Sequence, residues 1–199
     1  VSESLAVHPS DWKNGEVNLP LYRANYIDTV FKERGKNMKV VRSAEFKSVI
    51  RDMNEIENSD YELPEGIKAE LRGYQKTGYR WLCTLTHYGF GGVLADDMGL
   101  GKTLQVIALL TAFYQEKTEQ KAAGNEGSGS ELPLPSLIVC PASLVYNWGQ
   151  EFARFSPEIR VLLIAGTAKE RQEQLEEQMR MEASEGAQVI ITSYDLLKR

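Results

Sequence analysis

Two alternating patterns of apolar residues fill the second half of the chain. Short apolar runs at 92–95, 137–140, 160–165 and 189–192 predict strands, since a central strand covered on both faces needs no polar alternation. Apolar residues at helical spacing predict helices at 71–87, 104–114 and 143–155, the third of these capped by Ser143, and the highly charged, thinly apolar segment 169–182 predicts an exposed helix. Strands that alternate with helices form a parallel sheet. The pattern therefore predicts an α/β fold, with ligands at the carboxyl ends of the strands.

The first 64 residues show a different pattern. Apolar positions at helical spacing predict two amphipathic helices, at 20–31 and 43–53, with Ser43 as the cap of the second. The segment 62–66, Glu-Leu-Pro-Glu-Gly, has the composition of a linker. We therefore divide the chain into a helical N-terminal segment, 1–64, and a lobe, 65–199. The helices are expected to pack beside the lobe, with a separate partner-binding role as the alternative.

Composition limits the classes of function. The 199 residues carry a net charge of −5, which argues against a broad nucleic-acid surface, although residues 71–118 hold five Lys and Arg against three Asp and Glu.

Cys83 and Cys140 lie in apolar settings without a C-x-x-C spacing, and are expected to be buried free thiols. With two histidines in the chain, a zinc site is not expected. No apolar run is long enough to span a bilayer, so we expect a cytoplasmic protein with no membrane partner, associated with the nucleoid if bacterial and nuclear if eukaryotic. Residues 119–135, rich in Gly, Ser, Glu and Ala, are expected to form a flexible loop.

The strand at 92–95 runs into Asp-Asp-Met-Gly-Leu-Gly-Lys-Thr at 96–103, and an apolar helix follows at once. This layout suits a nucleoside triphosphate, because glycines let successive backbone N–H groups point at phosphate oxygens and the helix start adds its positive dipole end. Lys102 is expected to neutralise the β- and γ-phosphates, and Thr103 to offer its hydroxyl to Mg²⁺. Asp96 stands where the general G-x-x-x-x-G-K-[ST] pattern has glycine, which marks a special form of the loop.

That form closely resembles motif I of the Swi/Snf-type ATPases, DNA translocases of helicase superfamily two. Three further segments match the family in order: 71–82 resembles the Q-motif region, 137–148 motif Ia and 189–194 motif Ib. The resemblance, of bacterial type, implies a RecA-like P-loop lobe that binds ATP and Mg²⁺, in a parent protein that hydrolyses ATP to move along double-stranded DNA. No Asp-Glu dipeptide of a Walker B motif occurs in the 199 residues, and the second RecA-like lobe with its arginine fingers is missing. The lobe is therefore expected to be incomplete, to bind ATP at best and DNA weakly, and to lack hydrolysis.

The motif match also implies a role for individual residues. Catalysis is assigned to Lys102 and Thr103, with Thr103 as the metal ligand. ATP contacts are assigned to Gln75 (at the adenine), Asp97, Met98, Gly99, Leu100, Gly101, Lys102 and Thr103. Contacts to DNA phosphates are assigned to Pro141, Ser143, Asn147, Thr192 and Tyr194, and such contacts carry no sequence information.

Four residues have competing interpretations. Asp96 and Asp97 are expected to shape the loop by accepting backbone N–H bonds, and Asp97 also to reach the Mg²⁺ shell through water. Trp148 is expected to pack in the core and not to stack on a base, because duplex DNA offers no free base. Asp195 follows an apolar run as a Walker B acid does, but is expected to belong to the first turn of a short helix.

The main alternative is a self-contained P-loop kinase for a small molecule, or a nucleotide-binding module. Such a kinase needs its own Walker B motif and an acceptor lid, and neither is visible in the sequence. A GTPase needs an Asn/Thr-Lys-x-Asp motif, which is absent. Without a Walker B strand, an apolar surface that is exposed or covered by a partner is expected beside residues 93–95.

Overall fold

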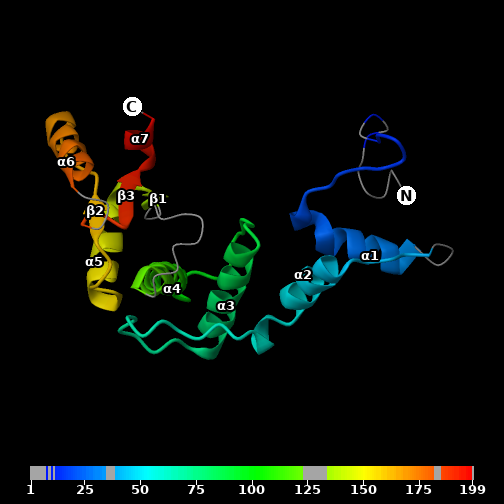
Figure 1. The fold of residues 1–199 in the computed structure, drawn as a ribbon. Helices are drawn as coiled ribbons and strands as arrows, with labels where there is room; N and C mark the ends of the chain where they lie inside the picture. Colours follow the sequence, from blue (N-terminus) through cyan, green and yellow to red (C-terminus); the bar gives the residue numbers. More distant parts are fainter. Residues whose placement is uncertain are drawn as a thin grey trace. The chain divides into compact units, whose positions relative to one another are not determined.

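The computed structural model describes residues 8, 10, 12–34, 39–122, 134–181 and 185–198 (Figure 1). The chain divides into two compact units. The N-terminal unit comprises Val1–Tyr61 and Arg80–Val93, and the sheet unit comprises Glu62–Tyr79 and Leu94–Arg199. Helix α3 (Gly73–His87) contributes its first half to the sheet unit and its second half to the N-terminal unit.

The N-terminal unit is helical. It contains η2 (Leu21–Arg23), α1 (Ala24–Arg34), α2 (Ala44–Asn54) and η3 (Ile56–Asn58). Ser43 caps α2, since its side chain accepts a hydrogen bond from the Phe46 amide at 3.1 Å. The buried Asp28 carboxylate pairs with Lys32 at 2.8 Å and Arg42 at 2.6 Å. The two helices predicted at 20–31 and 43–53, and the Ser43 cap, are confirmed with small shifts of their ends.

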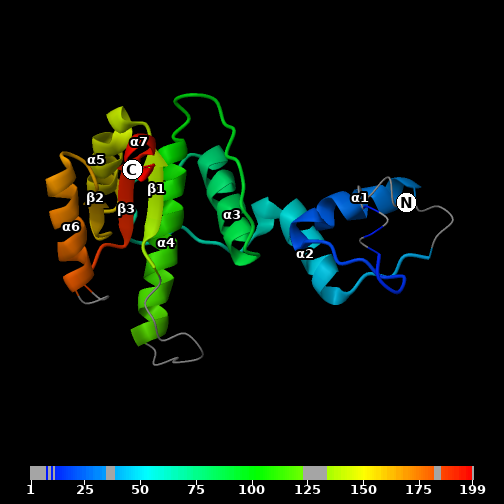
Figure 2. The ribbon, with the colours of Figure 1, turned by 90° about the horizontal axis from the view of Figure 1, so that it is seen from above.

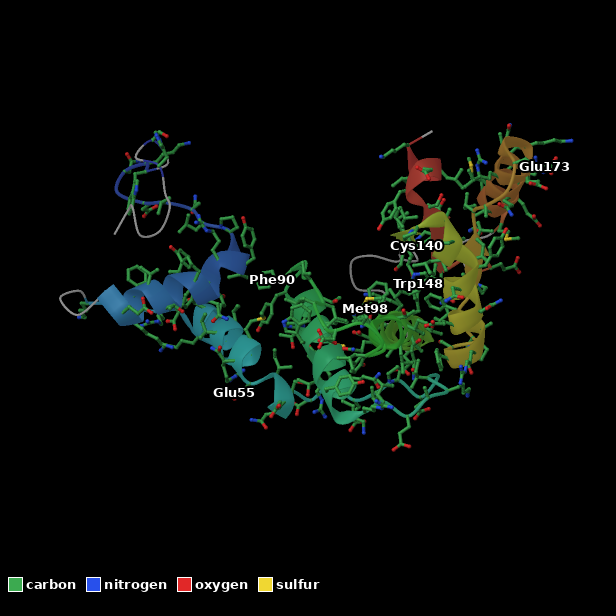
Figure 3. The ribbon with its side chains drawn as sticks, turned by 180° about the vertical axis from the view of Figure 1, so that it is seen from behind. Glu55, Phe90, Met98, Cys140, Trp148 and Glu173 are labelled. Atoms are coloured by element: carbon green, nitrogen blue, oxygen red, sulfur yellow. The ribbon has the colours of Figure 1, made fainter. Side chains whose placement is uncertain are left out.

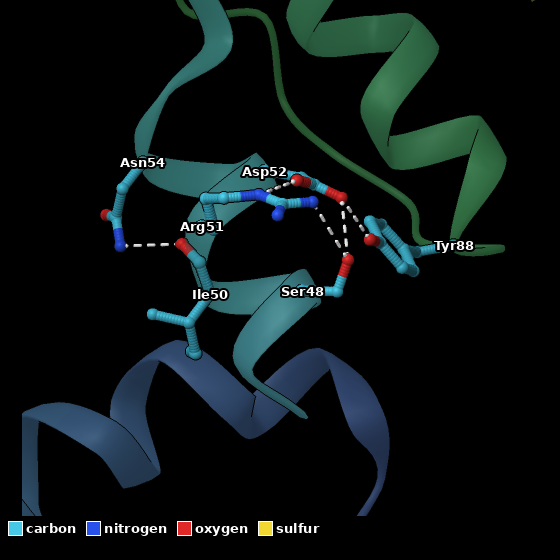
Figure 4. Close-up of polar contacts among 6 residues, drawn as sticks. All are labelled: Ser48, Ile50, Arg51, Asp52, Asn54 and Tyr88. Atoms are coloured by element: carbon cyan, nitrogen blue, oxygen red, sulfur yellow. Dashed lines mark hydrogen bonds and ion pairs between the residues drawn. The ribbon is translucent and has the colours of Figure 1, made fainter. Parts of the chain in front are cut away.

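A polar cluster in this unit joins α2 to the turn after α3 (Figure 4). The Tyr88 hydroxyl donates to Asp52 Oδ2 at 2.5 Å, and Asp52 also accepts from Ser48 and Arg51. The hydrogen bond from Tyr88 lowers the pKa of Asp52 below its ordinary value, and the same bond raises the pKa of Tyr88. Beside the cluster is a cavity of about 540 Å³, lined by residues of 51–61 together with Thr84, His87 and Tyr88.

The sheet unit contains three parallel strands in the order β1-β3-β2, which Figure 2 shows side by side. The strands are β1 (Ser136–Cys140), β2 (Val161–Leu163) and β3 (Val189–Ser193). In the central strand, Val189 pairs with Ser136 of β1 and with Val161 of β2. The predicted α/β fold with a parallel sheet is confirmed.

Four helices and one 3-10 turn complete the sheet unit: α4 (Lys102–Ala122), η4 (Ala142–Leu144), α5 (Val145–Phe155), α6 (Ala168–Arg180) and α7 (Tyr194–Leu197). Side chains of α4, α5 and the strands form one core, made of Ile107, Tyr114, Cys140, Val145, Phe152, Val189 and Ile191. The exposed helix α6 has a Thr167–Glu170 capping box and a Glu176–Arg180 ion pair at i,i+4 spacing. Within the described ranges, no helix combines the length and apolar character needed to cross a bilayer.

The segment 91–97 is not the strand that its apolar residues predict. A strand requires a ladder partner, and in the described part of the sheet β1, β2 and β3 pair only with one another. Val93 of this segment is 83% exposed. The loop at 96–103 therefore follows a segment without regular secondary structure.

Two helix boundaries also differ from prediction. Helix α4 continues to Ala122, into the stretch expected to be a loop from 119; Gln115–Glu119 and Glu116–Gln120 hydrogen bonds at i,i+4 spacing support the added turn. Residues 123–133 of the predicted loop lie outside the described residues. Ser143 lies in the η4 turn and does not cap α5, whose N-cap is Leu144 without a side-chain bond.

The Asp52–Tyr88 bond generates a prediction about pH. We expect Tyr88→Phe to lower the free energy of unfolding by about 1 kcal/mol at pH 7. Because the folded-state pKa of Asp52 is lowered, its contribution is present above the unfolded pKa of about 3.9 and is lost as pH falls through the folded pKa. The difference between wild type and variant should therefore shrink at pH 3.

Urea unfolding followed by circular dichroism at the two pH values measures this difference. Tyr22→Phe, at an exposed tyrosine, is the matched control and should change stability little. An equal loss for Tyr88→Phe at pH 3 and pH 7 would show that the bond does not depend on the carboxylate.

Candidate functional site

The loop at 96–103 turns tightly and runs directly into α4. Gly99 and Gly101 have φ of +83° and +72°, the left-handed region that other residues rarely adopt. Lys102 is the first residue of α4, and its Nζ donates to the carbonyl oxygens of Asp96 at 2.6 Å and Asp97 at 2.8 Å. The ammonium group therefore lies over the loop, beside a helix start whose first N–H groups have no partners within the helix.

Gln75 of α3 supports the loop from the other end. It is 7% exposed; its Nε2 donates to the Leu100 carbonyl at 3.0 Å, and its Oε1 accepts from the Arg72 amide at 2.9 Å. A Cβ on Gly101 would come within 2.4 Å of that Nε2, so any side chain at 101 would displace the Gln75 amide from this position. The amide keeps one N–H and one lone pair for another partner, and the predicted adenine contact stays a prediction.

Sequence reasoning missed Gln105. This residue of α4 is fully buried, and its Nε2 donates to Asp96 Oδ2 at 3.2 Å. The Asp96 carboxylate thus accepts a side-chain amide, where we expected a backbone N–H. The available signal was a single amide within an apolar helical run, Leu-Gln-Val-Ile-Ala-Leu-Leu at 104–110.

These residues fit a triphosphate with its metal. Two left-handed glycines, a cationic side chain and a helix N-terminus lie within residues 99–102. Together they offer the N–H donors and positive charge that phosphate oxygens require. Thr103 follows in the first turn of α4 and is half-buried. Among the described residues, no group of three His, Cys, Asp or Glu side chains could hold a metal. Met98 is 96% exposed at the loop (Figure 3) and is free to contact a ligand.

The predicted DNA-contacting residues lie where β1 and β3 end. Pro141, Ser143, Asn147 and Tyr194 are exposed. Thr192 is different: it is 5% exposed, and its Oγ1 donates to the Ile164 carbonyl at 3.2 Å. This burial argues against a phosphate contact by the Thr192 hydroxyl, because a buried hydroxyl that already donates within the protein cannot reach a DNA phosphate. The assignment of Thr192 rested on its motif alone.

A small cavity adjoins these exposed residues. It measures about 300 Å³, and its lining comes from the segments after all three strands, namely Ala142, Val145, Tyr146, Ala165, Gly166, Ser193, Asp195 and Leu196. Asp195 lies in the first turn of α7, as expected for a helix residue in place of a Walker B acid. The carboxyl edge of the sheet thus presents one continuous set of loops.

Trp148 and the two cysteines are structural. Trp148 is half-buried on α5 and packs against the core, with its ring centroid 6.3 Å from that of Phe152 (Figure 3). Cys83 and Cys140 are buried and form no disulfide, and burial raises the pKa of the Cys140 thiol. The predicted core role of Trp148 is confirmed, as is the predicted burial of both cysteines without a disulfide.

Residues 74–199 match the family model described as SNF2-related domain. The chain belongs to the SNF2 family. Residues 1–64 match a second model, described as bacterial SNF2 helicase associated. The parallel sheet with its preceding helices, and the four motifs, thus belong to a helicase-like ATPase family.

Similar proteins include much longer SNF2-family chains. The TATA-binding protein-associated factor mot1 of Aspergillus fumigatus is 36% identical over 79% of this chain, and helicase SWR1 of Eremothecium gossypii is 39% identical over 69%. The chain spans 8% of the length of each.

Solved structures of Sulfolobus solfataricus are also similar. The SWI2/SNF2 ATPase core domain is 32% identical, with a TM-score of 0.53. The same core in complex with dsDNA is 35% identical, with a TM-score of 0.50. They cover 72% and 70% of this chain, and the match spans 25% of each solved chain.

The loop geometry of this SNF2 chain predicts a graded response to alanine. Gly101→Ala combines left-handed strain with the clash against Gln75, and should cost about 2–3 kcal/mol of unfolding free energy. Gly99→Ala places its Cβ in open space, so only the left-handed strain should lower the unfolding free energy, by about 1–2 kcal/mol. Gly73→Ala, at the start of α3 with no atom near its Cβ, is the control and should be neutral.

Urea unfolding followed by circular dichroism ranks the three variants. Equal losses for Gly101→Ala and Gly73→Ala would contradict the loop conformation described above.

Proposed function

We propose that this chain supplies an ATP-binding lobe of a DNA-translocating SNF2 motor. The observation that carries the proposal is the Lys102 ammonium, which two loop carbonyls hold beside two left-handed glycines and a helix start. The β- and γ-phosphates of ATP would take the place of the Asp96 and Asp97 carbonyls as acceptors for Lys102. A phosphate oxygen is a stronger acceptor for an ammonium group than a neutral carbonyl, so the exchange is favourable.

In this proposal, the backbone of 97–101 surrounds the phosphates, and Thr103 offers its hydroxyl to Mg²⁺. Met98 contacts the nucleotide from outside the loop, and Gln75 reaches adenine through the part of its amide that the backbone leaves free. Lys102 and Thr103 are the groups that would stabilise charge on the transferred phosphoryl. A residue that orients the attacking water would come from the Walker B motif, which the 199 residues do not contain.

Double-stranded DNA would bind at the carboxyl edge of the sheet. The exposed Pro141, Ser143, Asn147 and Tyr194 offer amide, hydroxyl and backbone groups suited to phosphates of any sequence. The surface has few cations and the chain is acidic, so binding by this lobe alone should be weak. A second RecA-like lobe would complete the DNA clamp and close over ATP.

We also retain the division at residue 64. Residues 1–64 would form a helical module that packs with the second half of α3, and 65–199 the partial lobe. The match of 1–64 to a separate family model supports this division.

The loop's role is tested by removing its cation. We expect Lys102→Ala to weaken the binding of Mg·ADP by a factor of about 10 to 150, since a charge-assisted phosphate contact contributes about 1.5–3 kcal/mol. Isothermal titration calorimetry measures both affinities. Lys169→Ala removes an exposed lysine of α6 and is the matched control. Identical affinities for wild type and Lys102→Ala would show that the nucleotide binds elsewhere.

Catalysis is tested by phosphate release. We expect no appreciable ATP hydrolysis by the 199 residues, with or without duplex DNA, since an arginine finger alone contributes about 10³–10⁵ in rate and the metal-holding acids are missing too. A longer polypeptide that carries the Asp-Glu motif and the second lobe should show DNA-stimulated hydrolysis. DNA-stimulated ATP hydrolysis by the 199 residues would contradict the incomplete-lobe proposal. A longer polypeptide that shows no hydrolysis would contradict the proposed motor function.

A further inference from the structure

Gln105 occupies a costly position. It is fully buried on α4, one turn after Lys102, and its Oε1 has no hydrogen-bond partner among the described residues. A buried amide with an unmade hydrogen bond destabilises a fold relative to an apolar side chain of similar size. The other polar atom of the amide, Nε2, makes a hydrogen bond, and its partner is Asp96 of the nucleotide loop.

Its Nε2 donates to Asp96 Oδ2 at 3.2 Å, while the Asp96 carbonyl accepts from Lys102 Nζ at 2.6 Å. Asp96 is thus held by its side chain to one residue of α4 and by its backbone to another. Fixing the carboxylate limits the rotation of the Asp96 backbone, and hence the direction in which its carbonyl presents itself to Lys102. Gln105 and Lys102 are coupled through Asp96, although they do not touch each other in this network.

Gly78 makes room for the amide. An ideal Cβ at residue 78 would lie 1.9 Å from Gln105 Oε1 and 3.1 Å from its Cδ. Glycine in the middle of a helix costs about 0.5–1 kcal/mol relative to alanine, so its presence within α3 is explained by this close approach. In the preceding turn of α3, Gln75 holds the Leu100 carbonyl. Two glutamines therefore hold the two ends of the loop, Gln105 at Asp96 and Gln75 at Leu100.

We infer that Gln105 is a positioning residue for the nucleotide, acting through Asp96 on the direction of the Lys102 ammonium, and that Gly78 keeps it in place. The inference rests on the proposed binding of ATP phosphates at this loop. It predicts that losing the Gln105–Asp96 bond weakens nucleotide binding without weakening the fold, because a loop held in its binding geometry has less freedom to lose when the ligand arrives.

Gln105→Met tests this directly, since it keeps the volume and removes the amide. Mg·ADP affinity, measured by calorimetry on the 199-residue chain, should fall about tenfold, the effect typical of one hydrogen bond to a charged group. The thermal unfolding midpoint should stay the same or rise, because the unpaired Oε1 is gone. A merely structural residue would show the opposite, a lower midpoint with unchanged affinity, and that result would overturn the inference.

An exchange of the two groups provides the rescue test. Gln105→Glu places a second carboxylate beside Asp96 and should weaken binding further; adding Asp96→Asn exchanges amide and carboxylate and should restore affinity to within about threefold of wild type. A double variant no better than Gln105→Glu would overturn the inference. If Gln105→Glu does not fold, Gly78→Ala is the substitute variant. The new Cβ should displace the Gln105 amide and weaken Mg·ADP binding, whereas Gly73→Ala in the same helix should leave binding unchanged.

Lys102→Ala separates this inference from the proposed function. If Lys102→Ala loses affinity while Gln105→Met binds like wild type, the loop is the nucleotide site and only the role of Gln105 is wrong. If wild type and Lys102→Ala bind alike, or wild type does not bind, the proposed function fails and the inference fails with it.

Discussion

The tight turn at 98–101 is the constraint on which the described site depends. Phosphate oxygens require several N–H groups and a cation in one small volume, and the backbone supplies them only where two positions turn into the left-handed region. Glycine at 99 and 101 permits this turn, but it also leaves the loop with little stiffness of its own. Rigidity has to come from neighbouring helices. Gln75 from α3 and Gln105 from α4 supply it by bonding the Leu100 carbonyl and the Asp96 carboxylate.

The loop's charge is balanced in the same way. Lys102 is a cation beside a helix start, an arrangement that is unfavourable in isolation because both are positive. The carbonyls of Asp96 and Asp97 compensate by accepting from the ammonium group. A nucleotide bound as we propose would offer stronger acceptors to the same ammonium group. Binding would then be an exchange of hydrogen-bond partners by Lys102, with a net free energy smaller than the strength of any one contact suggests.

Much of this could be read from the sequence, because local patterns determine it. Helical spacing predicted α2, with Ser43 as its cap, and uninterrupted apolar runs predicted β1 and β3. The glycines of 96–103 predicted the loop and the helix that follows it. The failures concern tertiary partners. The apolar run at 92–95 has strand composition, but a strand exists only where a neighbour completes the ladder. Thr192 was assigned to DNA by its motif, yet the fold turns its hydroxyl toward Ile164. Gln105 was overlooked because an amide in a helix gives no sign of burial until α3 packs against it at Gly78.

We propose that nucleotide phosphates bind at the loop 96–103. An NMR titration of the ¹⁵N-labelled chain with Mg·ADP tests it most directly, because amide shifts locate the ligand residue by residue. The account predicts that the amides of Gly99, Gly101, Lys102 and Thr103 shift first and furthest, with Leu100 and Asp96 beside them. Shifts concentrated at the 540 Å³ cavity around Asp52 and Tyr88, with the loop amides unmoved, would contradict it.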